Sequence, residues 1–159
     1  MTNLVQSPLV ENKQQIYLQR VKLIYNQIKH WLPNNLKSAQ TKNHYVIDET
    51  GKYKAPILSI FKQNEPNELI AELLPVGTTV LMGDGLIEIH GNFGEESIIF
   101  LLKNGWLIQD RFGKQRPMYK EINTDDWYWI ENAYRNKASL VNKEMFLDLL
   151  KIVSLYDQT

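Results

Sequence analysis

The spacing of apolar residues predicts a long helix near the start of the chain. From Lys13 to Leu32, apolar residues recur every three or four positions, which is the spacing of one helix face. The stripe consists of Tyr17, Val21, Ile24, Ile28 and Trp31, widened by Leu18, Tyr25 and Leu32. Pro33 and two asparagines end the pattern. So wide an apolar face must pack against a sheet or a partner.

Between His44 and Ile122 the pattern changes to short segments separated by turn residues. We expect strands over residues 45–48, 53–61, 79–82, 86–91, 97–103, 106–111 and 118–122. Turns or breaks are expected at residues 49–52, 64–67, 75–77, 83–85 and 104–105. Asn104–Gly105 is the strongest hairpin signal, because both residues tolerate positive φ. The connections are too short for parallel crossovers, which predicts a mainly antiparallel meander of about five to seven strands.

Helical spacing returns towards the end of the chain. Thr124–Asp126 is typical of a helix start and predicts a short helix after it. Its apolar residues would be Trp127, Ile130 and Tyr134. A second helix, capped by Ser139 or Asn142, would carry one stripe of Met145, Leu149, Ile152, Val153 and Tyr156. The sequence therefore predicts an α+β fold, with the long N-terminal helix and two C-terminal helices packed on one face of the sheet.

Composition narrows the class of protein. The 159 residues include no cysteine, which excludes disulfide scaffolds, thiol nucleophiles, zinc–thiolate sites and iron–sulfur clusters. The longest apolar run, Ile98–Leu102, is far shorter than the roughly 18 residues of a membrane span. The first ten residues lack the pattern of a signal peptide. We expect a soluble, cytoplasmic protein with a flexible tail over 1–10 and a single α+β domain over 11–159.

The charges balance in number but are sorted along the chain. The chain has 18 basic and 18 acidic side chains, yet residues 1–63 carry nine basic and three acidic ones. Residues 64–102 carry seven acidic side chains and neither Lys nor Arg, whereas 103–120 carry five basic and one acidic. Most of the basic residues are Lys, which recognises phosphate less specifically than Arg does. Nucleic acid is therefore an unlikely partner, and a partner protein with a basic surface suits the acidic block.

The acidic block contains the most suggestive group of polar residues. Glu88 and His90 lie two positions apart on an expected strand and so share one face. Asp84 lies in the turn before that strand, and Glu95 and Glu96 lie in the turn after it. Carboxylates and an imidazole could bind a divalent metal or act in acid–base catalysis. The same alternation is also typical of a strand with one solvated face, and we favour that simpler interpretation.

The motifs of common catalytic machinery are missing. No G-x-S-x-G elbow is present, and neither Gly51–Lys52 nor Gly113–Lys114 is followed by the Ser or Thr of a phosphate-binding loop. We assign no catalytic residue, no metal ligand and no cofactor from the sequence. This favours a non-enzymatic role.

Two aromatic segments are further candidates for contact surfaces. Residues 106–120 interleave aromatic and basic side chains, which could stack bases and neutralise phosphates, although an edge hairpin blunted by Lys and Arg has the same composition. In the expected helix, Trp129 would point about 200° away from Trp127. Trp129 would then face solvent or a partner, or else cover the sheet edge or the last helix.

The sequence as a whole favours a non-enzymatic protein-interaction module: a regulatory, chaperone-like or toxin-neutralising protein. It would present an acidic hairpin surface to a basic partner protein. The candidate binding residues are Asp84, Glu88, His90, Glu95, Glu96 and Trp129. An alternative is a small ligand-binding domain or metal-assisted hydrolase with Glu88 and His90 in a pocket. A less favoured third hypothesis is a single-stranded nucleic-acid binder that uses residues 106–120.

Overall fold

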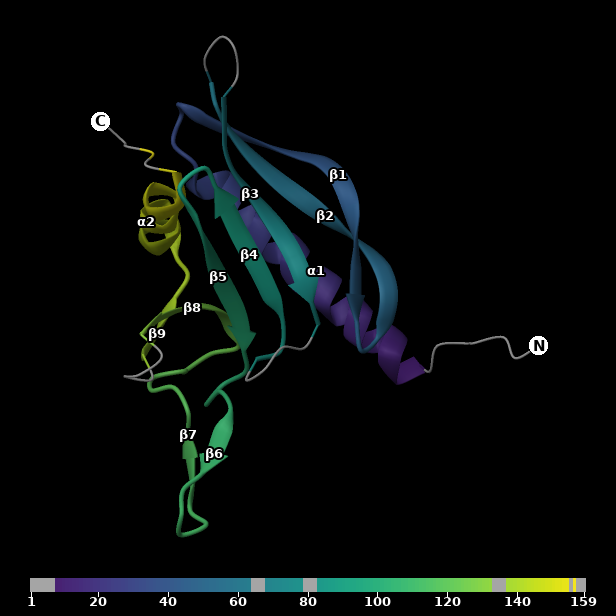
Figure 1. Cartoon of the computed structure of the whole chain (residues 1–159), viewed down its shortest axis with the longest axis vertical. Coiled ribbons are helices and arrows are strands. Elements are labelled where there is room, and N and C mark those ends of the chain that lie inside the picture. The colour runs from purple at the N-terminus through teal and green to yellow at the C-terminus, as the bar shows by residue number, and fades with distance from the viewer. Residues whose placement is uncertain (1–7, 64–67, 79–82, 133–136, 155, 157–159) are drawn as a thin grey trace, which may run out of the picture.

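A seven-stranded antiparallel sheet organises the fold, as the computed structural model shows (Figure 1). The structure describes residues 8–63, 68–78, 83–132, 137–154 and 156. The sheet consists of β1 (Leu36–Asp48), β2 (Gly51–Lys62), β3 (Glu68–Gly77), β4 (Leu86–Gly91), β5 (Gly94–Leu101), β8 (Asp126–Asn132) and β9 (Lys137–Leu140). The other elements are α1 (Pro8–Trp31), α2 (Lys143–Ser154) and a separate hairpin of β6 (Leu107–Gln109) and β7 (Gln115–Pro117).

The strands follow one another across the sheet almost in chain order. The spatial order is β1-β2-β3-β4-β5-β8-β9, and every neighbouring pair is antiparallel. The β6–β7 hairpin is an insertion between β5 and β8, and it projects away from the sheet (Figure 1). The predicted α+β class and the antiparallel meander are thus confirmed, with one hairpin interrupting the meander.

Both helices pack into one core. The inward side chains of α1, such as Val21, Ile24 and Ile28, are almost completely buried, as the spacing predicted. In α2 the residues Phe146 and Leu150 belong to the same cluster. Ile152, which the sequence predicted on the apolar stripe of the last helix, is 48% exposed, because the buried side of α2 is formed by Phe146, Leu149, Leu150 and Val153. The rings of Trp31 and Phe146 lie 6.2 Å apart and join the two helices. We call the side of the sheet that carries this core the helix face and the opposite side the outer face.

The short helix predicted after Thr124 is wrong. Residues 126–132 form strand β8, which pairs with β5, so the described part of the chain contains two helices rather than three. Trp127 and Trp129 lie two residues apart on this strand and therefore share the helix face, opposite Phe100 and Ile98. Aromatic residues pack well on a half-buried pleated surface, and that packing overrides the helix-start signal.

The turn predicted at Asn104–Gly105 exists, but the hairpin does not. Both residues have positive φ, 71° and 62°, as the turn requires. The strands on either side do not pair with each other, because β5 pairs with β8 while β6 pairs with β7. The Asn104 N–H donates instead to the Ile122 carbonyl, 2.8 Å away. The local signal fixed the turn conformation, and long-range strand pairing determined the partners.

Residues 118–122 form an irregular segment rather than the predicted last strand. Tyr119 and Ile122 are buried on the outer face against Leu101 and Tyr128, in a second, smaller core.

The break predicted at 75–77 is also wrong, because those residues belong to β3. The strand predicted over 79–82 and the break over 64–67 lie outside the described residues. Of the expected tail, residues 8–10 belong to α1 and residues 1–7 are not described.

Neither helix that the structure describes combines the length and the apolar character needed to cross a membrane.

Candidate functional site

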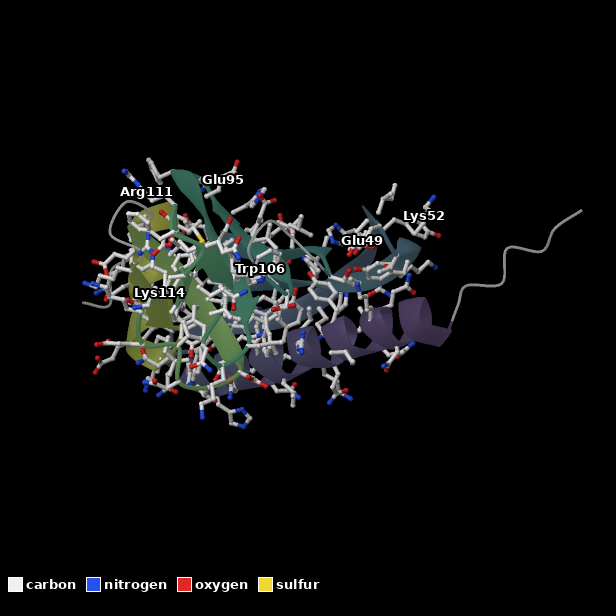
Figure 2. All side chains as sticks on the ribbon, turned by 90° about the horizontal axis from the view of Figure 1, so that it is seen from below. Glu49, Lys52, Glu95, Trp106, Arg111 and Lys114 are labelled. Atoms are coloured by element: carbon white, nitrogen blue, oxygen red, sulfur yellow. The ribbon has the colours of Figure 1, made fainter. Side chains whose placement is uncertain are left out.

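Strands β3, β4 and β5 bring four polar side chains together on the outer face. His90 on β4 pairs with Glu72 on β3 and with Glu95 on β5. The Nε2 atom of His90 lies 3.4 Å from Glu88 Oε1 and 3.6 Å from Glu95 Oε2. We call Glu72, Glu88, His90 and Glu95 the acidic face. Figure 2 shows Glu95 on the side of the sheet away from α1.

The strand pleat explains why these residues meet. Alternate residues of β4 point to opposite faces, so Ile87 and Ile89 enter the core while Glu88 and His90 point outward. The side chains of Glu88, His90 and Glu95 remain 35%, 40% and 64% exposed. All three side chains are therefore accessible to water, and also to a ligand or a partner.

Three atoms of the acidic face are close enough to share a divalent cation. One ligand atom from each of Glu88, His90 and Glu95 lies within 4.8 Å of the other two. Carboxylate oxygens and an imidazole nitrogen suit ions such as Zn²⁺ or Mn²⁺. The same donors also suit the ammonium or guanidinium groups of a basic protein, because each carboxylate can accept several hydrogen bonds.

Glu96 and Trp129 belong to a different surface. Glu96 pairs with Ile89 and so lies on the helix face, where its Oε2 accepts a 2.9 Å hydrogen bond from Trp129 Nε1. The Trp129 side chain is half-buried and packs against the core, beside Met145 of α2. The structure thus separates these two predicted site residues from Glu88, His90 and Glu95.

Asp84 lies apart from both groups, next to α1. Its backbone carbonyl accepts a 3.2 Å hydrogen bond from Arg20 Nη1. Burial raises the pKa of the Asp84 carboxyl above its ordinary value, and the charge of Arg20 opposes that rise. Asp84 and Glu88 are close in sequence. Asp84 lies in the turn before β4, whereas Glu88 lies within β4 and belongs to the acidic face.

A buried polar network near Asp84 was not predicted from the sequence. The Asp48 carboxylate accepts hydrogen bonds from the Thr50 N–H and hydroxyl, from the Tyr53 hydroxyl at 2.7 Å and from the Thr78 N–H at 2.9 Å. Gln14 of α1 donates to the Thr50 carbonyl and hydroxyl. The sequence contained one signal of this network. Gln14 is a polar residue three positions before Tyr17, on the apolar side of the predicted helix.

The tyrosines of this region are held by burial and by the network. Burial raises the pKa of Tyr17, whose hydroxyl donates to the Leu86 carbonyl at 2.6 Å and accepts from the Val76 N–H at 3.1 Å. Burial also raises the pKa of Tyr53, and its hydrogen bond to Asp48 acts in the same direction. Both phenols therefore stay neutral and serve as fixed structural donors.

The β6–β7 hairpin, which we call the arm, exposes basic and apolar side chains. The Phe112 side chain at its tip is 86% exposed, and Figure 2 shows Arg111 and Lys114 at one end of the molecule. Two of the aromatic residues predicted for base stacking have other contacts. Tyr119 is buried in the second core, and the Trp106 side chain hydrogen-bonds to Asp84.

Comparison with known protein families, with curated proteins and with solved structures found no match. The geometry of the chain itself therefore carries the functional argument.

Proposed function

We propose that this protein is a non-enzymatic binding module whose acidic face docks on a basic surface of a partner protein. The observation that carries the proposal is the convergence of three glutamates around His90 on the side of the sheet that bears no helix. The segment 64–102 that supplies them contains neither Lys nor Arg. The carboxylates of this face would attract a cationic surface and accelerate encounter.

Repulsion within the face supports the same proposal. Glu88 and Glu95 hold carboxylate oxygens within 4.8 Å of each other, and like charges on neighbouring strands are destabilising. Cationic side chains of a partner would relieve this repulsion by donating charge-assisted hydrogen bonds. A strand face that served solubility alone would gain nothing from such crowding.

The position of Glu88 and His90 favours binding over catalysis. The two residues line none of the five described cavities, which open near α1, near α2 and beside the segment 118–124. A substrate at His90 would stay in contact with water instead of being enclosed. A broad protein surface is the ligand that suits an open, charged face of a sheet.

Site-specific photo-crosslinking in the native host tests the location of the interface. A photoreactive residue replaces Ser97, which pairs with Glu88 on the outer face, and a control replaces Leu23, an exposed residue of α1. We expect Ser97 to capture one basic protein that Leu23 does not capture. Equal capture from both positions, or from Leu23 alone, would contradict the assignment.

Charge neutralisation then tests the chemistry with the captured partner. The triple variant E72Q/E88Q/E95Q removes three charges from the acidic face, and E49Q/E121Q/E144Q removes three exposed charges elsewhere. The first should slow association at low salt about tenfold or more and flatten its salt dependence, while the second should change little. Equal effects would refute a local surface, and loss of binding in EDTA would point to a metal site instead.

A further inference from the structure

The arm presents basic side chains that pair with no acid in the described part of the chain. Arg111, Lys114 and Arg116 are all exposed, and none of the ion pairs between described residues includes them. Asp110, the one acid between Leu107 and Pro117, uses its carboxylate to accept backbone N–H groups of the arm. The exposed ring of Phe112 stands at the tip beside these cations. Cationic and aromatic side chains together are typical of the surfaces that proteins use for docking.

The acidic face offers the complementary set of side chains. Among the described residues, the only ion-pair partner of its glutamates is His90, which contacts Glu88 and Glu95. No Lys or Arg of the described chain neutralises them. Phe93, in the turn that joins β4 to β5, stands two residues before Glu95 and is 66% exposed. The arm and the acidic face thus match in charge, and each has an exposed aromatic ring beside it.

The arm and the acidic face of one chain are too far apart to meet. Glu95 lies next to the β4–β5 turn, whereas the chain leaves for the arm after Leu101, at the opposite end of β5. The six residues from Glu95 to Leu101 correspond to about 20 Å of strand. The arm also projects away from the sheet beyond that end (Figure 1). A contact between an arm and an acidic face must therefore join two copies of the chain.

We infer that two copies of this protein exchange arms, so that Arg111 and Lys114 of each copy bind the acidic face of the other. The inference rests on the proposed function of the acidic face and adds a second copy as its occupant. Figure 2 shows Arg111 on the same side of the molecule as Glu95, away from α1. Two copies that oppose their outer faces in antiparallel orientation therefore place each arm over the acidic face of the other copy. Such a pair has two identical contacts related by two-fold symmetry, so it closes as a dimer.

Sedimentation velocity of the purified full chain tests the exchange. We expect a monomer–dimer equilibrium in about 0.01 M salt and a monomer in about 1 M salt, because screening shortens the reach of charges from roughly 30 Å to roughly 3 Å. The variant R111E/K114E reverses two charges of the exposed arm and should weaken the dimer at low salt at least about tenfold. The control K22E/K143E reverses two exposed charges on α1 and α2 and should dimerise as the wild type does. Equal effects of the two variants would overturn the inference.

A second pair of substitutions makes the test reciprocal. The variant E88K/E95K reverses the charge of the acidic face and, like R111E/K114E, should be monomeric on its own. In an equimolar mixture each contact joins groups of opposite charge again, an acidic arm on a basic face and a basic arm on an acidic face, so dimers should return. A mixture of the folded variants that stays monomeric would overturn the exchange. A wild type that stays monomeric at low salt would do the same, even if its arm bound a single-stranded oligonucleotide.

Crosslinking from Ser97 separates this inference from the proposed function. In the purified protein, a photoreactive residue at Ser97, beside Glu88, should link two copies of the chain. In the host, a partner protein with a basic surface competes with the arm for the same face. If Ser97 captures such a partner while the purified protein shows no link between copies, the proposed function stands and the exchange of arms is overturned.

Discussion

Asp48 connects the β1–β2 turn to the end of β3 through a single carboxylate. Asparagine offers one acceptor oxygen and would place an NH₂ group against donors, so D48N should lower the free energy of unfolding by about 1–3 kcal/mol at pH 7. Urea unfolding measures the loss. D110N is the matched control, because Asp110 also accepts backbone N–H bonds but does so in the exposed arm. A larger loss in D110N than in D48N would contradict the importance of this network.

The same carboxylate predicts a pH dependence. Burial raises the pKa of Asp48, but the hydrogen bonds from Thr50, Thr78 and Tyr53 outweigh burial and hold the pKa below its ordinary value. A depressed folded-state pKa stabilises the protein above the unfolded pKa and loses that contribution as the pH falls through the folded value. The stability difference between wild type and D48N should therefore shrink below about pH 4. A difference that stays constant down to pH 2 would refute this cause.

Gly91 allows α2 to approach the sheet closely. An ideal Cβ at this position would lie 2.3 Å from the carbonyl oxygen of Val153, which is backbone and cannot rotate away. G91A should therefore lower the free energy of unfolding by about 1–3 kcal/mol, as overpacking does. Gly94, across the same turn, has no atom within 4 Å of an added Cβ, so G94A should be close to neutral. Chemical denaturation of both variants checks the contrast, and equal losses would contradict it.

At the scale of elements, the periodicity of apolar residues predicted the two helices correctly. The stripe predicted from Tyr17 to Trp31 lies on α1, and most of the stripe predicted from Met145 to Tyr156 lies on α2, because each helix packs into one core. Residues 126–132 became β8 because pairing with β5 buries Trp127 and Tyr128 on opposite faces, a tertiary effect that a window of sequence does not contain. The same limit applies to Asn104–Gly105, where the predicted turn is present but the strands on either side of it do not pair with each other.

Only part of the candidate site could be predicted from the sequence, because the rest depends on which strands pair. Glu88 and His90 share a face because a strand has a period of two, and the sequence is sufficient for that prediction. The turn predicted at Glu95 and Glu96 is wrong, because β5 begins at Gly94 and contains both residues, and adjacent strand residues point to opposite faces. The position of Asp84 beside Arg20 of α1 depends on how the folded chain packs.

The arm adds little to the core of the protein. Its strands are mostly exposed, and a two-stranded hairpin alone is at best marginally stable in water. Ile108 and Arg116 are paired across the arm, so an Asn-Gly turn can replace residues 109–115 between them. This deletion should change the free energy of unfolding by less than about 1 kcal/mol in urea titration. A loss comparable to that of a core variant would show that the arm supports the sheet.

At the scale of the whole molecule, one cluster links both helices to the sheet and predicts cooperative unfolding. Ile24 of α1 and Leu150 of α2 are both fully buried in that cluster. I24A and L150A should each lower the free energy of unfolding by about 2–5 kcal/mol. In both variants, tryptophan fluorescence and far-UV circular dichroism should show coincident transitions, because losing either helix opens the core that contains Trp127. If L150A released α2 in a separate, earlier transition, the helices would belong to independent units instead.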